Sequence, residues 1–134
     1  MLSRLHDLAE HRKTFAFEST LAAKHYAGWI KKLRKQGYAF QLMFLSLRSA
    51  DLAVQRVRER VQVGGHHVPE QVVRRRYAAG VRNFSNLYQP LADTWAVYDN
   101  SNLPDPIIIA QGGQGEEQNI FRADLWRDFR KMSQ

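Results

Sequence analysis

Apolar residues recur every three or four positions along five stretches of the chain, which is the spacing of amphipathic helices. Ser19 or Thr20 can cap the second helix, and Gly37 can end it. Ser49 caps the third, with Asp51 favourably placed in its first turn. The predicted helices cover residues 2–12, 20–36, 50–63, 69–91 and 120–132.

Shorter apolar runs between these helices predict four strands, at residues 14–18, 38–47, 95–99 and 106–110. The second run is apolar almost throughout, which predicts a strand covered on both faces in a parallel sheet. The last two are joined by too few residues for a crossover helix, so we expect a hairpin. This order of elements predicts one α/β domain, or part of one, with a right-handed crossover between parallel strands.

Composition narrows the class of protein. The 134 residues include no Cys, which excludes disulfides and thiolate metal sites. No apolar run approaches the roughly 20 residues that span a bilayer, and the N-terminus does not read as a signal peptide, so we expect a cytoplasmic protein. The formal net charge of +7 indicates anionic partners without saying which.

Arginines are concentrated in the third and fourth predicted helices, on either side of a Gly-Gly-His-His loop. They are Arg56, Arg58, Arg60, Arg74, Arg75, Arg76 and Arg82. Arg56 and Arg60 share one helix face, whereas three consecutive arginines cannot all meet one phosphate. Guanidinium groups suit phosphate, so this arrangement favours a polyanion site that closes over a nucleotide. The alternative is a set of solvated helix faces.

Other candidate motifs have competing readings. The Glu18-Ser19-Thr20 sequence follows the first predicted strand, where it can bind sugar hydroxyls or phosphate, or cap a helix. His66 and His67 have no third ligand at metal spacing, so no metal site is predicted. Asp99 and Asn100 form either a turn or a site. Residues 112–115 lack the GxxxxGK[ST] pattern and indicate a flexible linker.

Three segments together resemble the zeta toxin family of P-loop kinases. They are FAFEST-L (residues 15–21), AVQRVRERVQVGGHHVPEQVVRRRYAAGVRNF (53–84) and YQPLADTWAVYDNSN (88–102), and the resemblance covers residues 2–111. It implies a partial three-layer P-loop-kinase fold, with parallel core strands, a C-terminal hairpin and an arginine-rich helical lid. It also implies an ATP- and Mg²⁺-dependent kinase whose acceptor is a nucleotide sugar such as UDP-N-acetylglucosamine.

The resemblance also implies roles for individual residues. Glu18 and Thr20 look like the acid and hydroxyl that contact the substrate. The family's lid arginines, which hold the ATP phosphates, correspond to Arg56, Arg60 and one or both of Arg75 and Arg76. Arg60, Arg75 and Arg76 would also stabilise the transferring phosphoryl group. His66 looks like the family's lid-loop histidine and is counted with the nucleotide-binding residues, without a specific role.

The sequence departs from the family because no stretch of it matches a Walker A motif. The family's P-loop and its catalytic aspartate lie upstream of the first predicted helix, so residues 1–111 are interpreted as the C-terminal part of a kinase domain, followed by a linker and helix at 112–134. We expect no kinase activity from the chain alone. We also expect an exposed strand edge that leads to self-association or needs an N-terminal segment.

Two functions compete with the kinase interpretation. One is a non-catalytic protein that binds a nucleotide or nucleic acid, although few aromatic residues are interleaved with the arginines, which disfavours nucleic acid. The other is an interaction domain with an antitoxin protein as its partner. Steep weakening of binding by salt would indicate nucleic acid.

Overall fold

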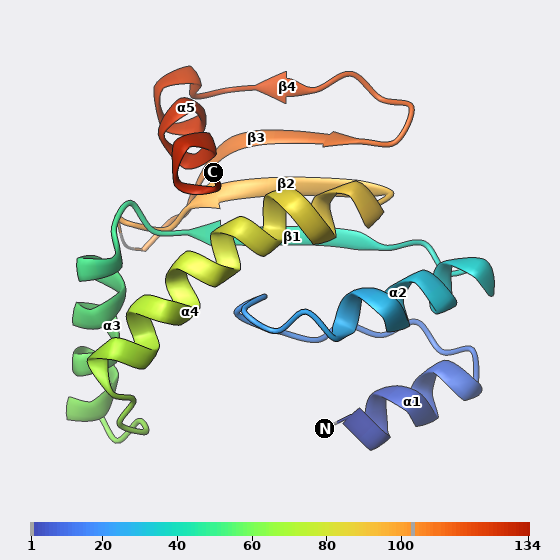
Figure 1. Cartoon of the computed structure of the whole chain (residues 1–134), viewed down its shortest axis with the longest axis horizontal. Coiled ribbons are helices and arrows are strands. Elements are labelled where there is room, and N and C mark those ends of the chain that lie inside the picture. The colour runs from blue at the N-terminus through green and yellow to red at the C-terminus, as the bar shows by residue number, and fades with distance from the viewer. Residues whose placement is uncertain (1, 103) are drawn as a thin grey trace.

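The computed structural model describes residues 2–102 and 104–134, which form a mixed four-stranded sheet with helices packed against it (Figure 1). The sheet order is β1-β2-β3-β4, with β1 and β2 parallel and the other pairs antiparallel. The predicted α/β class and the hairpin are confirmed. The helices are α1 (Leu2–Glu10), α2 (Tyr26–Lys35), α3 (Ala50–Gln62), α4 (Glu70–Asn83) and α5 (Ala123–Met132), and the strands are β1 (Gln41–Ser46), β2 (Thr94–Asp99), β3 (Ile107–Gly113) and β4 (Asn119–Ile120).

The core lies between one face of the sheet and the helices α4 and α5, which cross in front of it in Figure 1. Phe84 is fully buried at its centre. Its ring centroid lies 5.1 Å from that of Phe44 and 5.6 Å from that of Phe129. Trp126 stacks on Trp95 at 5.6 Å. The C-terminal helix therefore supplies two large side chains to the core.

Helix α4 continues beyond its regular turns. A π-helical turn at Phe84–Tyr88 and a 3₁₀ turn at Gln89–Leu91 extend it to the end of the predicted range. The wider turn brings both Phe84 and Tyr88 into the core, where each is fully buried. Pro90, which has no N–H to continue a helix, lies in the last turn.

The prediction of a strand at residues 14–18 is wrong. This segment pairs with no strand in the described parts of the chain. Its two aromatic side chains pack on Trp29 of α2 instead, with ring centroids at 5.8 Å for Phe15 and 6.0 Å for Phe17. The aromatic composition that favours a strand is therefore used for packing on a helix, because a strand also needs a neighbour to complete its ladder.

The start of α2 also differs from the prediction. Ser19 and Thr20 do not cap it, since their hydroxyl oxygens accept hydrogen bonds from the backbone N–H groups of Leu21 (3.1 Å) and Ala22 (3.3 Å). These short turns delay the helix to Tyr26. Its end is as predicted: Gly37 has φ +98°, and the N–H of Tyr38 donates to the carbonyl of Leu33.

Asp93 ties α2 to the beginning of the sheet. Its carboxylate accepts hydrogen bonds from the backbone N–H of Phe40 (2.7 Å) and from the Arg34 guanidinium (2.8 Å). These two donors lower the pKa of Asp93 below its ordinary value. The ion pair fixes the end of α2 beside the start of β1.

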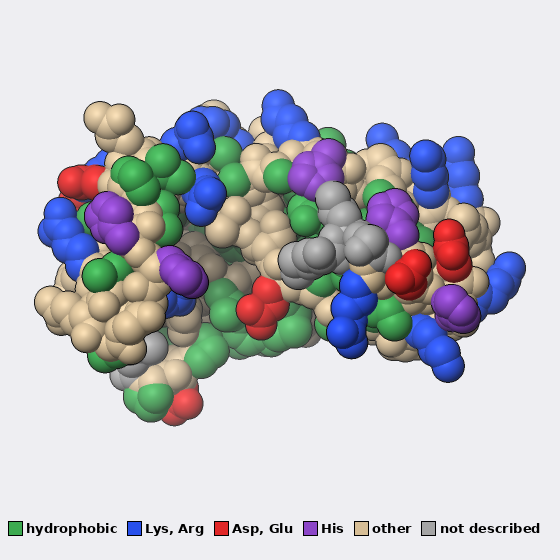
Figure 2. Space-filling view, turned by 90° about the horizontal axis from the view of Figure 1, so that it is seen from below, with side chains coloured by type: hydrophobic (Ala, Val, Ile, Leu, Met, Phe, Trp, Pro, Cys, Tyr) green, Lys and Arg blue, Asp and Glu red, His purple; other side chains and the backbone are tan. Residues whose placement is uncertain are grey.

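Strand β1 forms as predicted, but only one of its faces is covered. Burial alternates along it, with Leu42 and Ser46 buried and Met43 and Leu45 exposed. It is also an edge strand, because only β2 pairs with it in the described residues. Figure 2 looks from the side of β1, α1 and α2, and hydrophobic side chains gather in its lower middle.

We expect the exposed edge of β1 to cause self-association. Met43 and Leu45 are 68% and 54% exposed, and an unpaired, apolar strand edge is a template for pairing. Sedimentation velocity should show oligomers that grow with concentration and that diminish when both residues are changed to Lys. The matched control is Val63→Lys, at an exposed valine outside the sheet, which should leave the distribution unchanged. A monodisperse wild-type monomer at high concentration would contradict this expectation.

The interpretation of residues 112–115 as a flexible linker is wrong for its first half. Gly112 and Gly113 belong to β3 and pair with Trp95 and Thr94. A Cβ at Gly112 would lie 2.8 Å from the Trp95 ring, and one at Gly113 would lie 2.4 Å from the carbonyl oxygen of Asp93. Close packing therefore requires these glycines. The final helix begins at Ala123, later than predicted, because residues 119–120 form β4.

Candidate functional site

Helices α3 and α4 and the loop between them (residues 50–83) form an antiparallel pair that we call the arginine hairpin. Ser49 caps α3 as predicted, since its hydroxyl oxygen accepts from the N–H of Leu52 at 3.1 Å. Gly64, with φ +97°, turns the chain at the far end, and α4 begins directly after Pro69. In Figure 1 α3 follows the end of β1, and α4 runs back from the tip of the pair across the sheet.

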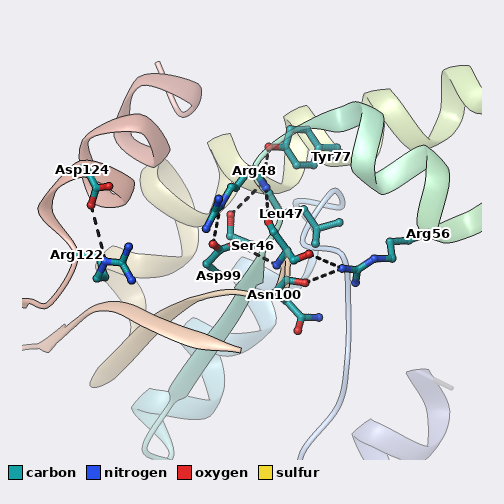
Figure 3. Close-up of polar contacts among 10 residues, drawn as sticks. Ser46, Leu47, Arg48, Arg56, Tyr77, Asp99, Asn100, Arg122 and Asp124 are labelled. Carbon is teal, nitrogen blue, oxygen red and sulfur yellow. Dashed lines mark hydrogen bonds and ion pairs between the residues drawn. The ribbon is translucent and has the colours of Figure 1, made fainter. Parts of the chain in front are cut away.

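Three polar side chains fix the arginine hairpin and the neighbouring loops to the carboxyl ends of the parallel strands (Figure 3). The Tyr77 hydroxyl donates to the carbonyl of Leu47 at 2.7 Å. The Arg56 guanidinium donates to the carbonyls of Asn100 (3.1 Å) and Ser101 (2.9 Å). Arg48 pairs with Asp99 at 2.8 Å. In open α/β sheets this edge is where ligands bind.

Asp99 is the buried acid of this edge, with 2% of its surface exposed. Burial alone would raise its pKa, but hydrogen bonds from Ser101 and Arg48 outweigh it and lower the pKa of Asp99 below the ordinary value. The sequence left open whether Asp99 belongs to a turn or to a site. The structure supports the turn, because the Asp99 carboxylate accepts a hydrogen bond from the backbone N–H of Ser101 at 3.0 Å and so organises the loop after β2.

Asp99→Asn is expected to lower the free energy of unfolding at neutral pH by about 1–3 kcal/mol, because a charged hydrogen bond is lost. A carboxyl whose pKa is lowered by folding stabilises above its ordinary pKa, and this contribution disappears as the pH falls through the folded value. Wild-type urea midpoints should therefore decrease below about pH 4, and less so in the variant. The exposed control Asp105→Asn should follow the wild type. A variant with the full acid sensitivity of the wild type would contradict this role.

The structure divides the seven arginines into three groups. Arg56 donates to backbone carbonyls. Arg74 pairs with Asp51 (2.6 Å) and Glu70 (2.9 Å), and Arg58 pairs with Glu70 at 3.5 Å. The others have no acidic partner in the described residues; they are Arg60, Arg75, Arg76 and Arg82, and all four are exposed.

The loop that contains Thr20 lies against the same flank of α4 as Arg76. A Cβ on Gly80 would lie 2.4 Å from the carbonyl oxygen of Thr20, so the two backbones touch. The Asn83 amide donates to the carbonyls of Leu21 (2.7 Å) and Ala22 (3.1 Å). Arg76 precedes Gly80 by four residues, which is one helical turn on the same face.

The remaining predicted site residues are exposed. Glu18 lies in the extended segment before Thr20, and His66 lies in the loop at the far end of the arginine hairpin. Neither makes a hydrogen bond or ion pair with the described residues. The site roles of Glu18, Thr20, His66 and the arginines stay predictions.

Three residues that the sequence did not single out shape this region. Gly80 and Asn83 on α4 hold the loop of residues 20–22, and Lys24 lies at the end of that loop. For Asn83 the sequence did contain a signal. Asn83 is a polar residue next to the apolar stripe that Val73, Tyr77, Val81 and Phe84 form on α4, and a buried amide needs partners from another segment.

Comparison with known proteins gives the family. The family model described as Zeta toxin matches residues 3–109, well over half of the chain. The chain belongs to the zeta toxin family. It is thus a member of a kinase-like toxin family, as the resemblance implied. An uncharacterized protein of Haemophilus influenzae is 29% identical over 63 residues, which are 47% of this chain and 45% of that protein. The match thus spans less than half the length of that relative, and no solved structure matches.

Membership in the zeta toxin family makes ATP and Mg²⁺ the cofactors to test against these residues. The unpaired guanidinium groups of Arg60, Arg75 and Arg76 have the chemistry to bind phosphate. In the described residues, no three acidic or histidine side chains gather into a metal-binding group of their own. In kinases Mg²⁺ is held by one or two carboxylates together with the nucleotide phosphates and water. The described residues also include no helix long and apolar enough to cross a membrane.

We expect Arg56 to set the position of the arginine hairpin in this zeta toxin family member. Arg56→Lys keeps the charge but loses the fork that reaches two carbonyls. Hydrogen exchange of the amides at residues 100–102 should therefore become faster by about tenfold, the equivalent of one net hydrogen bond. Arg60→Lys, on the same helix and without a partner, should leave exchange unchanged. Equal exchange in both variants would show that Arg56 does not hold this loop.

Proposed function

We propose that the chain is the C-terminal, lid-bearing part of an ATP-dependent phosphotransferase of zeta-toxin type. The main support is that Arg60, Arg75 and Arg76 have no acidic partner in the described residues, while the hairpin that carries them is fixed at the carboxyl ends of β1 and β2. Free guanidinium groups there can bind the ATP phosphates and stabilise the charge on a transferring phosphoryl group.

We propose a nucleotide sugar, such as UDP-N-acetylglucosamine, as the acceptor. The Thr20 hydroxyl accepts a hydrogen bond from the N–H of Ala22, so its own proton is available to a ligand. The carboxylate of Glu18 can accept hydrogen bonds from sugar hydroxyls. Because Thr20 lies beside the flank of α4 that carries Arg76, an acceptor bound there would approach a phosphate held by the arginine hairpin.

The chain alone is proposed to be inactive. Catalysis of phosphoryl transfer consists almost entirely of positioning and charge stabilisation, and in P-loop enzymes the Walker A backbone and lysine supply most of the phosphate cradle. No part of the 134-residue sequence matches that motif. An N-terminal segment that carries it is therefore a proposed partner, and membership in a toxin family supports an antitoxin protein as another.

The test is to fuse the P-loop segment of a zeta toxin to the N-terminus and to measure ATP-dependent phosphorylation of UDP-N-acetylglucosamine. The chain alone should give no product, and the fusion should. Arg60→Gln in the fusion should reduce the rate by about 10³-fold, as expected for an arginine that stabilises the transition state. Arg58→Gln, on the same helix but paired with Glu70, is the matched control and should retain most activity.

Three results would contradict the proposal, each at a different point. ATP turnover by the chain alone, abolished by Arg60→Ala, would show that no additional segment is needed. A fusion that is folded and binds ATP but phosphorylates no nucleotide sugar would remove the proposed acceptor. Nucleic-acid binding by the chain alone that weakens steeply with salt would favour the binding-protein alternative.

A further inference from the structure

A basic groove lies between the loop at residues 22–24 and the C-terminal end of α4 with the turn that follows it, apart from the tip of the arginine hairpin. It is an open hollow of about 260 Å³. Ala22 and Lys24 line it on one side, and Ala79, Arg82 and Asn86 line it on the other. We call it the Lys24–Arg82 groove. A liquid water molecule occupies about 30 Å³ and pockets for drug-sized ligands begin at about 300 Å³, so the groove suits a small group.

Backbone contacts hold the two walls of the groove together. The carbonyl of Thr20 touches α4 at Gly80, where no side chain intervenes. The buried Asn83 amide donates to two successive carbonyls of the loop, and the Tyr88 hydroxyl donates to the carbonyl of Ala23. Lys24 therefore follows a fixed loop, and the groove does not have to be assembled when a ligand arrives.

None of the residues that line the groove is acidic. They lie in segments 22–24 and 79–87, and neither segment contains Asp or Glu. In the described residues, Lys24 and Arg82 have no ion pair, in contrast to Arg74, which two carboxylates neutralise. Two exposed cations beside an amide, without counter-charges, produce a positive potential that attracts anions.

We propose that the Lys24–Arg82 groove binds an oxyanion group, phosphate or carboxylate, of a small ligand. Arg82 offers a planar fork that matches the oxygens of either group, and Lys24 offers a compact charge. The amide of Asn86, which lines the same groove, can donate a further hydrogen bond. The groove does not include Arg60, Arg75 or Arg76, so it does not depend on the proposed phosphotransfer.

The test is a titration of the whole chain, labelled with ¹⁵N, with pyrophosphate and separately with citrate at low ionic strength. At least one of these anions should shift the amide resonances of residues 22–24 and 79–87 in a saturable way. The double variant Lys24→Gln with Arg82→Gln should raise Kd about tenfold or more, since two charge-assisted contacts are lost. The matched control Arg127→Gln with Lys131→Gln removes the same charge from α5 and should change Kd less than twofold.

Each alternative outcome counts against the site. Equal weakening in the control would show a general charge effect, and shifts confined to the arginine hairpin that vanish in Arg60→Gln would place the anion there. Saturable binding of an oligonucleotide with no response to either small anion would also overturn the proposal. Far-UV circular dichroism of each variant checks that it is folded.

Discussion

Phe129→Ala is expected to lower the free energy of unfolding by about 3–5 kcal/mol, the usual loss when a buried phenylalanine is truncated. The Phe129 side chain is 1% exposed and touches the rings of Phe44, Phe84 and Trp126. Small domains have a total stability of about 5–15 kcal/mol, so this one change should remove a large part of it. Urea denaturation followed by tryptophan fluorescence measures the difference.

Arg127→Ala, on the exposed side of the same helix, is the control for Phe129→Ala and should change stability by no more than about 0.5 kcal/mol. The comparison tests whether α5 is part of the cooperative core or an appended helix. Nearly equal midpoints for the two variants would mean that α5 can detach without unfolding the sheet.

Gly80→Ala is expected to destabilise the chain by about 1–3 kcal/mol, the cost of overpacking a site that cannot expand. Alanine normally favours a helix over glycine by about 1 kcal/mol, so the expected sign is the reverse of the intrinsic preference. The reason is the carbonyl oxygen of Thr20, 2.4 Å from the position of the added Cβ. Backbone atoms must separate, and the hydrogen bonds that Asn83 makes with the loop weaken with them.

Gly28→Ala provides the matched control for Gly80→Ala, because no atom lies within 4 Å of a Cβ added at Gly28 in α2. It should stabilise the chain by up to about 1 kcal/mol. The same substitution thus has opposite expected signs at two helical positions. If Gly80→Ala also stabilises, the contact between Thr20 and α4 is not a tight one.

Local signals in the sequence predicted the structure correctly where a feature depends on a few neighbouring residues. The Ser49 cap, the left-handed Gly37 and the start of α4 after Pro69 all appear where they were predicted. The hairpin of β2 and β3 also followed from the short connection between them.

Features that depend on partners distant in the sequence were predicted wrongly from local composition. Residues 14–18 have the composition of a strand but lack a paired neighbour, and Gly112 and Gly113 have the composition of a loop but pack closely in a strand. Likewise, the apolar run of β1 could not reveal that one of its faces is open.

The candidate site shows the same limit. The sequence identified a concentration of arginines but could not distinguish Arg74, which two acids neutralise, from Arg75 and Arg76, which are unpaired in the described residues. That distinction depends on Asp51, which lies 23 residues from Arg74 and reaches it only because α3 and α4 are antiparallel. The approach of Thr20 to Gly80 was not predictable either, because a backbone contact leaves no pattern in side-chain types.

The place of α5 has a practical consequence for engineering. The family model ends at residue 109, inside β3, whereas Trp126 and Phe129 fill the interior beyond it. A recombinant protein trimmed to the family boundary would lose Trp126 from its stack with Trp95, the last four residues of β3 and the whole of β4. Chimeras between relatives should therefore exchange residues 107–134 as one segment, together with Phe84 at the end of α4, which packs on Phe129.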